Sequence, residues 1–170
     1  KGSNDQSINV FACFDNEEVG SGTKQGAAST FLYDVLHRIN NALGKDDEDY
    51  YRALAASFML SADNAHAVHP NHPEKTDVNN CVYMNEGVVV KSHAQFFANR
   101  SDVVGGSTLG NIAMAQVSMN SVDIGLPQLA MHSSYETAGI KDTYYMIQVM
   151  EEFFNSHIEE TSAHELKVTR

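Results

Sequence analysis

The stretch "SINVFACFDNEEVGSGTKQGAAS" (Ser7–Ser29) places two adjacent glutamates directly after a short apolar run. Its first part, Ser7–Phe14, is rich in β-branched and aromatic residues, which predicts a buried strand. Glu17 and Glu18 follow where this strand would end, and the small residues after them predict a sharp turn. Adjacent acidic residues are usually solvated. The stretch therefore fits either a surface loop or a catalytic site at the end of a strand.

The composition is that of an ordinary folded protein. The 170 residues are enough for one domain with a real core, so residues 1–170 are expected to form a single domain. A net charge of -11 argues against a nucleic-acid-binding surface. No apolar run approaches the roughly 20 residues that span a bilayer. Two cysteines and no leader-like start predict a reducing, cytoplasmic compartment.

Predicted strands alternate with predicted helices along the chain. Helices are expected from near Gln25 and over residues 44–58. Strands are expected at Met59–Asp63 and at Gly87–Lys91, and the continuous apolar run of the second predicts burial on both faces. This alternation indicates an α/β layered fold.

The C-terminal part predicts a capped helix. A strand and a turn within residues 121–133 lead to His132. Ser133 with Glu136 three residues later matches a capping box. Apolar residues at helical spacing between Ile140 and Ile158 then predict one long amphipathic helix.

Residues suited to metal chemistry follow several predicted strands. These residues are Glu17 and Glu18, Asp63, Lys91 and His132. In open α/β sheets, sites gather at the carboxyl ends of strands. In an extended backbone, neighbouring side chains point to opposite sides, so one glutamate would ligate a metal while the other acts as general base. Glycosidase chemistry fits less well, because its two carboxyls must flank a sugar at about 5 Å or more.

Asp63 is followed by a histidine triplet at His66, His69 and His72. A spacing of three would align ligands on a helix, but Pro70 interrupts a regular helix here. Asp63 alone is therefore the better ligand candidate, with a turn cap as its structural alternative. For His132, the alternative is a buried histidine with a structural role.

Four stretches together resemble a known family. They are "DNEEVGSGTKQGAAS" (Asp15–Ser29), "SADNAHAVHPNHPEK" (Ser61–Lys75), "NRSDVVGGSTLGNI" (Asn99–Ile112) and "DIGLPQLAMHSSYE" (Asp123–Glu136). In this order they resemble the aspartyl aminopeptidase family of dinuclear zinc aminopeptidases. The resemblance implies a zinc-exopeptidase-like α/β fold with a mixed β-sheet sandwiched by helices. It also implies a homo-oligomer, possibly a dodecamer in the complete enzyme.

The resemblance implies a metal site with two zinc ions when complete. Matched by position, Glu17 resembles the general base. Glu18 and His132 resemble ligands of one zinc ion, and Asp63 resembles a ligand of the other.

The resemblance also implies a substrate. His66 and Lys91 match positions that contact substrate, and Lys91 suits an acidic side chain or a carboxylate. The expected function is zinc-dependent removal of N-terminal residues, Asp or Glu above all, from peptides. No nucleic-acid or membrane partner is implied.

The sequence departs from the family in length. Family chains are much longer, and their first zinc-binding histidine and metal-bridging aspartate lie upstream of the matched region. The family carries a further helical segment where Gln95 here runs directly into Phe96, so that either residues are absent from this chain or the protein is a shortened variant. The inserted oligomerisation domain is expected not to be present. The chain is therefore expected to be the C-terminal portion of the catalytic domain. The alternative is a catalytically incomplete, peptidase-like fragment that acts only as a binding or assembly module.

Overall fold

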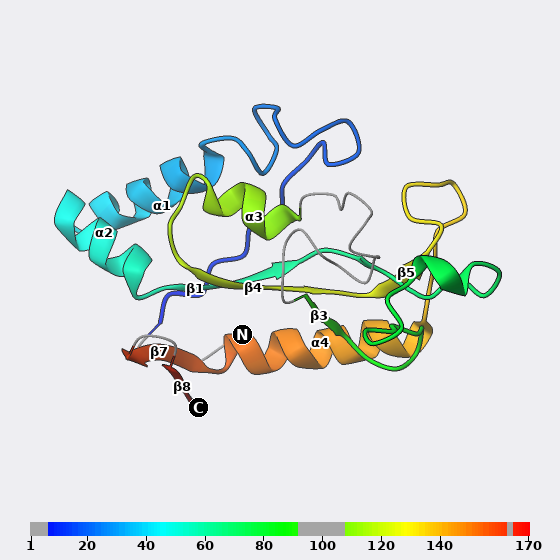
Figure 1. The fold of residues 1–170 in the computed structure, drawn as a ribbon. Helices are drawn as coiled ribbons and strands as arrows, with labels where there is room; N and C mark the ends of the chain where they lie inside the picture. The colour runs from blue at the N-terminus through cyan, green and yellow to red at the C-terminus, as the bar shows by residue number, and fades with distance from the viewer. Residues whose placement is uncertain (1–6, 92–107, 163–164) are drawn as a thin grey trace. The chain divides into compact units, whose positions relative to one another are not determined.

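The computed structural model describes residues 7–91, 108–162 and 165–170, and the chain divides into two compact units. The first unit comprises residues 1–59, 110–121 and 152–170, and the second comprises residues 60–109 and 122–151. Figure 1 shows the ribbon with most of its helices and strands labelled. The predicted helical insertion point between Gln95 and Phe96 lies outside the described residues.

The first unit is mainly helical. It contains α1 (Phe31–Ala42), α2 (Asp47–Ala55) and most of α3 (Leu109–Met114), with an antiparallel hairpin of β7 (His157–Ser162) and β8 (Glu165–Thr169). Helices α1 and α2 lie side by side (Figure 1). Their buried side chains form one apolar cluster, made by Leu32, Tyr50, Leu54 and Val117.

The two predicted N-terminal helices are present with changed boundaries, and α2 (Asp47–Ala55) is shorter than the predicted residues 44–58. Helix α2 begins as expected, because the Asp46 carboxylate accepts a hydrogen bond from the Asp49 backbone N–H at 2.9 Å and completes a capping box. Helix α1 begins at Phe31, whereas the sequence predicted a start near Gln25. The residues before it fold into turns, in which the Ala28 N–H donates to the Ser21 carbonyl at 3.1 Å.

The predicted strand at Ser7–Phe14 is wrong. This segment carries no strand assignment, and within residues 7–91, 108–162 and 165–170 no strand of the three sheets pairs with it. Ala12 and Phe14 pack against the apolar cluster of the first unit, but Phe11 is 77% exposed. Strand-forming residues make a strand only where a neighbour accepts their hydrogen bonds.

The second unit contains most of two three-stranded sheets. One has the order β1 (Phe58–Ala62), β4 (Asn120–Gly125), β3 (Val89–Lys91), and β3 runs antiparallel to β4. The other has the order β2 (Ala65–His66), β5 (Pro127–Leu129), β6 (Thr137–Ala138). In that sheet β2 is parallel to β5, and β5 is antiparallel to β6. Mixed sheets with helices confirm the predicted α/β fold class.

Strands β1 and β3 occur where the sequence placed them, but β3 is not buried on both faces. It ends the order β1-β4-β3, and Val90 is 67% exposed whereas Lys91 is buried. A strand at the edge of a sheet has fewer neighbours to cover it. Between β2 and β3 the chain forms one short 3-10 helix, Pro73–Lys75.

Helix α4 (Ile140–Phe154) ends before Ile158, the last residue of the predicted stripe. It also begins later than a cap at Ser133 would place it. Ile158 lies in β7, and Ile140 and Tyr144 are 87% and 61% exposed, so the predicted apolar stripe does not form a buried face along its length. The first turn instead buries Asp142 completely. Its carboxylate accepts hydrogen bonds from the backbone N–H groups of Asn85 at 2.6 Å and Gly87 at 3.0 Å.

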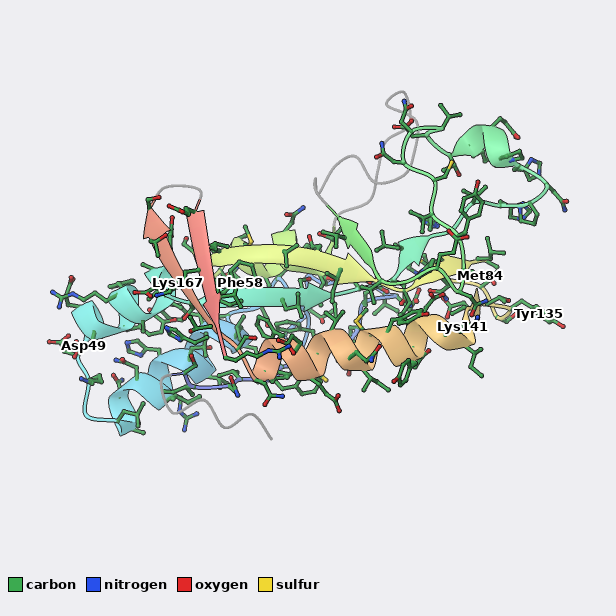
Figure 2. The ribbon with its side chains drawn as sticks, turned by 90° about the horizontal axis from the view of Figure 1, so that it is seen from below. Asp49, Phe58, Met84, Tyr135, Lys141 and Lys167 are labelled. Carbon is green, nitrogen blue, oxygen red and sulfur yellow. The ribbon has the colours of Figure 1, made fainter. Side chains whose placement is uncertain are left out.

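These bonds fasten the segment before β3 to the start of α4. Figure 2 shows Met84 and Lys141 at the same end of the helix, and the Lys141 N–H donates to the Asn85 side-chain oxygen at 3.0 Å.

Both cysteines, Cys13 and Cys81, are free thiols. Among the described helices, none combines the length and apolar character needed to cross a bilayer.

Candidate metal centre

In the first unit, the loop after Phe14 carries the two adjacent glutamates. The Asp15 N–H donates to the Gln25 carbonyl at 3.0 Å and closes the base of this loop. Glu17 and Glu18 lie within the closed part and are exposed. Glu17 opens a turn, because its carbonyl accepts from the Gly20 N–H at 3.1 Å. The extended backbone that would have sent the two side chains to opposite sides is therefore replaced by a turn.

The two carboxylates come close together. One oxygen of Glu17 and one of Glu18 lie within 4.8 Å of each other. Like charges at this separation raise each other's energy unless a cation or donor groups compensate them. The pair is therefore suited to face a cation, and the donor type is one that zinc accepts.

Asn16 and Gly26 shape this loop. Asn16 has a positive φ of 65°, a conformation that asparagine tolerates better than most residues. Its side-chain NH₂ donates to the Thr23 hydroxyl at 3.1 Å across the loop. At Gly26 a Cβ atom would overlap the Ser21 carbonyl oxygen, so a larger residue would push the loop open. Sequence reasoning missed Asn16, although its place directly before the glutamates was a usable signal.

In the second unit, Asp63 directly follows β1 beside the end of β4. Its N–H donates to the Ile124 carbonyl at 2.9 Å, which continues the pairing of β1 with β4. At Gly125 a Cβ atom would overlap the Asp63 carbonyl oxygen, so glycine is needed for this approach. The predicted position of Asp63 at a strand end is confirmed.

Lys91, at the end of β3, reaches Asp63 at the end of β1, on the other side of β4. Its ammonium donates to the Asn64 carbonyl at 2.8 Å and lies 3.9 Å from Asp63 Oδ2, with only 3% of the side chain exposed. Burial lowers the pKa of Lys91, while the negative charges of Asp63 and Asp123 act to raise it. The lysine is thus a buried cation next to two carboxylates.

His66 and His132 belong to the same unit. His66 ends β2 and is paired in register with Gln128 of β5. Burial lowers the pKa of His66, and the charges of His132 and Lys91 lower it further. A lowered pKa favours the neutral imidazole, which can donate one hydrogen bond and accept another.

His132 lies in a tight loop between β5 and β6. Its φ is 67°, a conformation that costs a non-glycine residue energy and is common at functional sites. The His132 N–H donates to the Glu136 carboxylate at 2.7 Å. Ser133 and Glu136 therefore stabilise this loop, and the predicted capping box is wrong because α4 begins only at Ile140.

The remaining histidines of the triplet lie apart from this arrangement. The rings of His69 and His72 are 5.2 Å apart, and His72 pairs with Glu74 at 3.2 Å at the surface. Within the described residues, no cluster of three or more metal-type ligands includes either one. The preference for Asp63 over the whole triplet stays a prediction.

Comparison with known proteins matches this chain to aminopeptidases. The family model "Aminopeptidase I zinc metalloprotease (M18)" matches residues 1–96 and 93–154. The two stretches overlap at residues 93–96, around the predicted insertion point between Gln95 and Phe96. A probable M18 family aminopeptidase 2 of Clostridium novyi is 46% identical over 88% of this chain and 40% of that protein. A probable aspartyl aminopeptidase of Ricinus communis is 34% identical over 92% of this chain and 37% of that protein.

Solved structures that match this chain include Ape4 and Ape1. A chain in the cryo-EM structure of the Ape4 and Nbr1 complex matches with a TM-score of 0.75 and 35% identity, over 81% of this chain and 31% of that one. A chain of the S. cerevisiae mApe1 dodecamer matches with a TM-score of 0.64 and 31% identity, over 84% of this chain and 36% of that one. The chain spans roughly 40% of the length of the curated relatives that it matches.

Proposed function

The chain belongs to the aminopeptidase I family of zinc metalloproteases, M18, and from this premise we propose that it forms part of a zinc-dependent aminopeptidase active site. The full-length protein would remove N-terminal residues from peptides, with a preference for Asp and Glu. The observation that carries the proposal is the Glu17–Glu18 pair, whose carboxylate oxygens approach within 4.8 Å on a loop fixed by Asn16. Two carboxylates this close together suit one metal ligand and one base.

The candidate ligands fit zinc by their chemistry. Glu18 and His132 would hold one ion and Asp63 the other, which offers carboxylate oxygens and an imidazole nitrogen, all donors that zinc accepts. Each zinc ion takes about four ligands. Three protein ligands are too few for two ions, so further ligands would have to come from other residues of the full-length protein.

When bound, zinc would acidify a water molecule and polarise the scissile carbonyl. The Glu17 carboxylate would accept the proton of the attacking water, because it is exposed next to Glu18. Glu17 would then return this proton to the leaving amine. A single carboxylate can perform both transfers, since the base of the first step is the acid of the second.

Two side chains of the second unit would bind the substrate. Lys91 would offer a positive charge to an acidic side chain or carboxylate. His66, whose lowered pKa favours the neutral form, would offer a hydrogen bond without adding charge. Preference for Asp or Glu would therefore depend on Lys91 rather than on His66.

The assembly and location of the protein are also proposals. The matched S. cerevisiae mApe1 is a dodecamer, and we expect the full-length protein to be a homo-oligomer too. Two free thiols, at Cys13 and Cys81, favour a reducing compartment such as the cytoplasm.

Substitutions at the glutamate pair test the proposal in the full-length protein. Glu17→Gln should abolish hydrolysis of aspartyl and glutamyl p-nitroanilides yet keep its zinc, because only the base is lost. Glu18→Gln should lose about tenfold or more in zinc affinity, since a metal ligand is weakened. Exposed Glu86 is the matched control, and Glu86→Gln should change neither quantity.

Zinc content by mass spectrometry and initial rates before and after chelation are the measurements. The reverse pattern of metal loss would mean that the two glutamates exchange roles. A zinc-loaded wild-type protein without any turnover would contradict the peptidase proposal and favour the binding or assembly module.

A further inference from the structure

A buried carboxylate lies opposite the candidate substrate lysine. Asp123 is on β4 and Lys91 on β3, and the two residues are direct partners in the antiparallel register. Directly opposed residues project to the same face of a sheet, with Cβ atoms about 4.5–5.5 Å apart. Both are buried, at 8% and 7% exposed. Neither composition nor motif spacing had singled out Asp123.

The Asp123 carboxylate has a fixed orientation. Its Oδ2 accepts a hydrogen bond from the Thr108 hydroxyl at 2.7 Å, and both groups are buried. Its Oδ1 is also buried, and among the described residues no hydrogen-bond donor reaches it. A buried carboxylate needs a compensating positive charge, because desolvation otherwise penalises it strongly.

Lys91 is the positive charge on the next strand, and the charge of Asp123 acts on it, although its direct contacts lie at the end of β1. Its ammonium lies at the Asn64 carbonyl and 3.9 Å from Asp63 Oδ2, at the end of β1. In the order β1-β4-β3, the lysine side chain must cross β4, the strand that carries Asp123, to reach that point. The carboxylate of Asp123 therefore lies along the path of the Lys91 side chain.

We infer that Asp123 is a positioning residue that holds Lys91 across β4, and that the Thr108 hydroxyl fixes Asp123 for this task. Lys91 then presents its ammonium beside Asp63 in one defined place. The consequence for acidic substrates rests on the proposed function, in which Lys91 recognises the acidic group. The positioning itself does not rest on it.

The test measures the accessibility of Lys91 in the full-length protein. Acetylation by N-hydroxysuccinimide acetate is followed residue by residue with mass spectrometry. In the wild type Lys91 should react slowly, since its side chain is buried. Asp123→Asn keeps the shape but removes the charge, and it should accelerate labelling of Lys91 about tenfold, as expected for loss of one charged interaction.

Control variants separate positioning from general loosening. Asp34→Asn removes a similar carboxylate, which accepts from the Thr30 hydroxyl at 2.8 Å at the surface, and it should leave Lys91 labelling unchanged. Thr108→Val should raise Lys91 labelling by a smaller factor, whereas Thr108→Ser, which keeps the hydroxyl, should restore the wild-type rate. If Asp123→Asn does not fold, the Thr108 pair still decides the question.

The kinetic arm is the ratio of kcat/KM for aspartyl and leucyl p-nitroanilides. Asp123→Asn should lower this ratio, because loss of the positioned ammonium outweighs removal of one negative charge beside it, and it should leave kcat for the leucyl substrate near its wild-type value. Unchanged Lys91 labelling in folded Asp123→Asn and Thr108→Val would overturn the inference, whatever the activity. Faster labelling with an unchanged ratio would keep the positioning role and contradict acid recognition by Lys91.

Discussion

Asp142 should be among the most sensitive positions of the second unit. Its carboxylate is fully buried and accepts from the backbone N–H groups of Asn85 and Gly87 at 2.6 and 3.0 Å. Asp142→Ala would remove the buried acceptor of both part-buried hydrogen bonds, at a cost of about 1–3 kcal/mol for each bond. We therefore expect the free energy of unfolding to fall by about 2–6 kcal/mol, which is a large part of a typical domain's stability.

The matched control is Asp77, which makes two similar bonds at the surface. It accepts from the Asn79 N–H and the Asn80 side-chain NH₂, each at 2.9 Å. Water can replace an exposed acceptor, so Asp77→Ala should cost no more than about 1 kcal/mol. Urea unfolding followed by circular dichroism measures both variants in the full-length protein. Equal losses for Asp142→Ala and Asp77→Ala would refute the reasoning from burial.

Two further predictions concern the candidate metal centre. In Asn16→Ala, residue 16 must adopt a positive φ without its cross-loop hydrogen bond, and this left-handed conformation costs alanine about 1–2 kcal/mol. Asn16→Ala should therefore lower the thermal unfolding temperature and kcat more than Asn16→Gly does. If the two variants are indistinguishable, backbone strain does not explain the loop. His132→Ala should deplete zinc, measured by mass spectrometry of the purified protein, whereas His72→Ala at the surface should not, and equal depletion would revive the histidine triplet as a metal site.

Elements held by local interactions were predictable from the sequence. Helix α2 begins where its acidic first turn predicted, because Asp46 caps it within four residues of chain. The position of Asp63 after β1 followed from a short apolar run that ends in a carboxylate. For α2 the deciding contact is near in sequence. For β1 the apolar pattern is strong enough to locate the strand.

Two elements were not predictable, because the hydrogen-bond partners that form differ from those that the sequence pattern suggests. Ser7–Phe14 has strand-forming residues, yet no strand of the described residues pairs with it. Ser133 and Glu136 have the spacing of a capping box, but the Glu136 carboxylate instead accepts from the N–H of His132. A spacing rule specifies which bonds are possible, and competing donors decide which of them forms.

The same limit explains why Lys91 was found and Asp123 was not. Lys91 ends an apolar run, which is visible in sequence, whereas its pairing with Asp123 depends on the register between β3 and β4. Register is a property of two strands that are separated along the chain. Buried charged residues that face each other in this way are visible only once the sheet is assembled.

The charges around Lys91 bear on how acidic substrates could be preferred at all. Asp63 and Asp123 are two carboxylates beside one buried ammonium, and the lowered pKa of His66 favours an imidazole that adds no positive charge. This group alone would repel an acidic side chain, since negative charge exceeds positive charge. A divalent cation held by Asp63 would reverse the sign of the group. On the proposed function, preference for N-terminal Asp or Glu would therefore require the bound metal as well as Lys91, because neither one outweighs both carboxylates by itself.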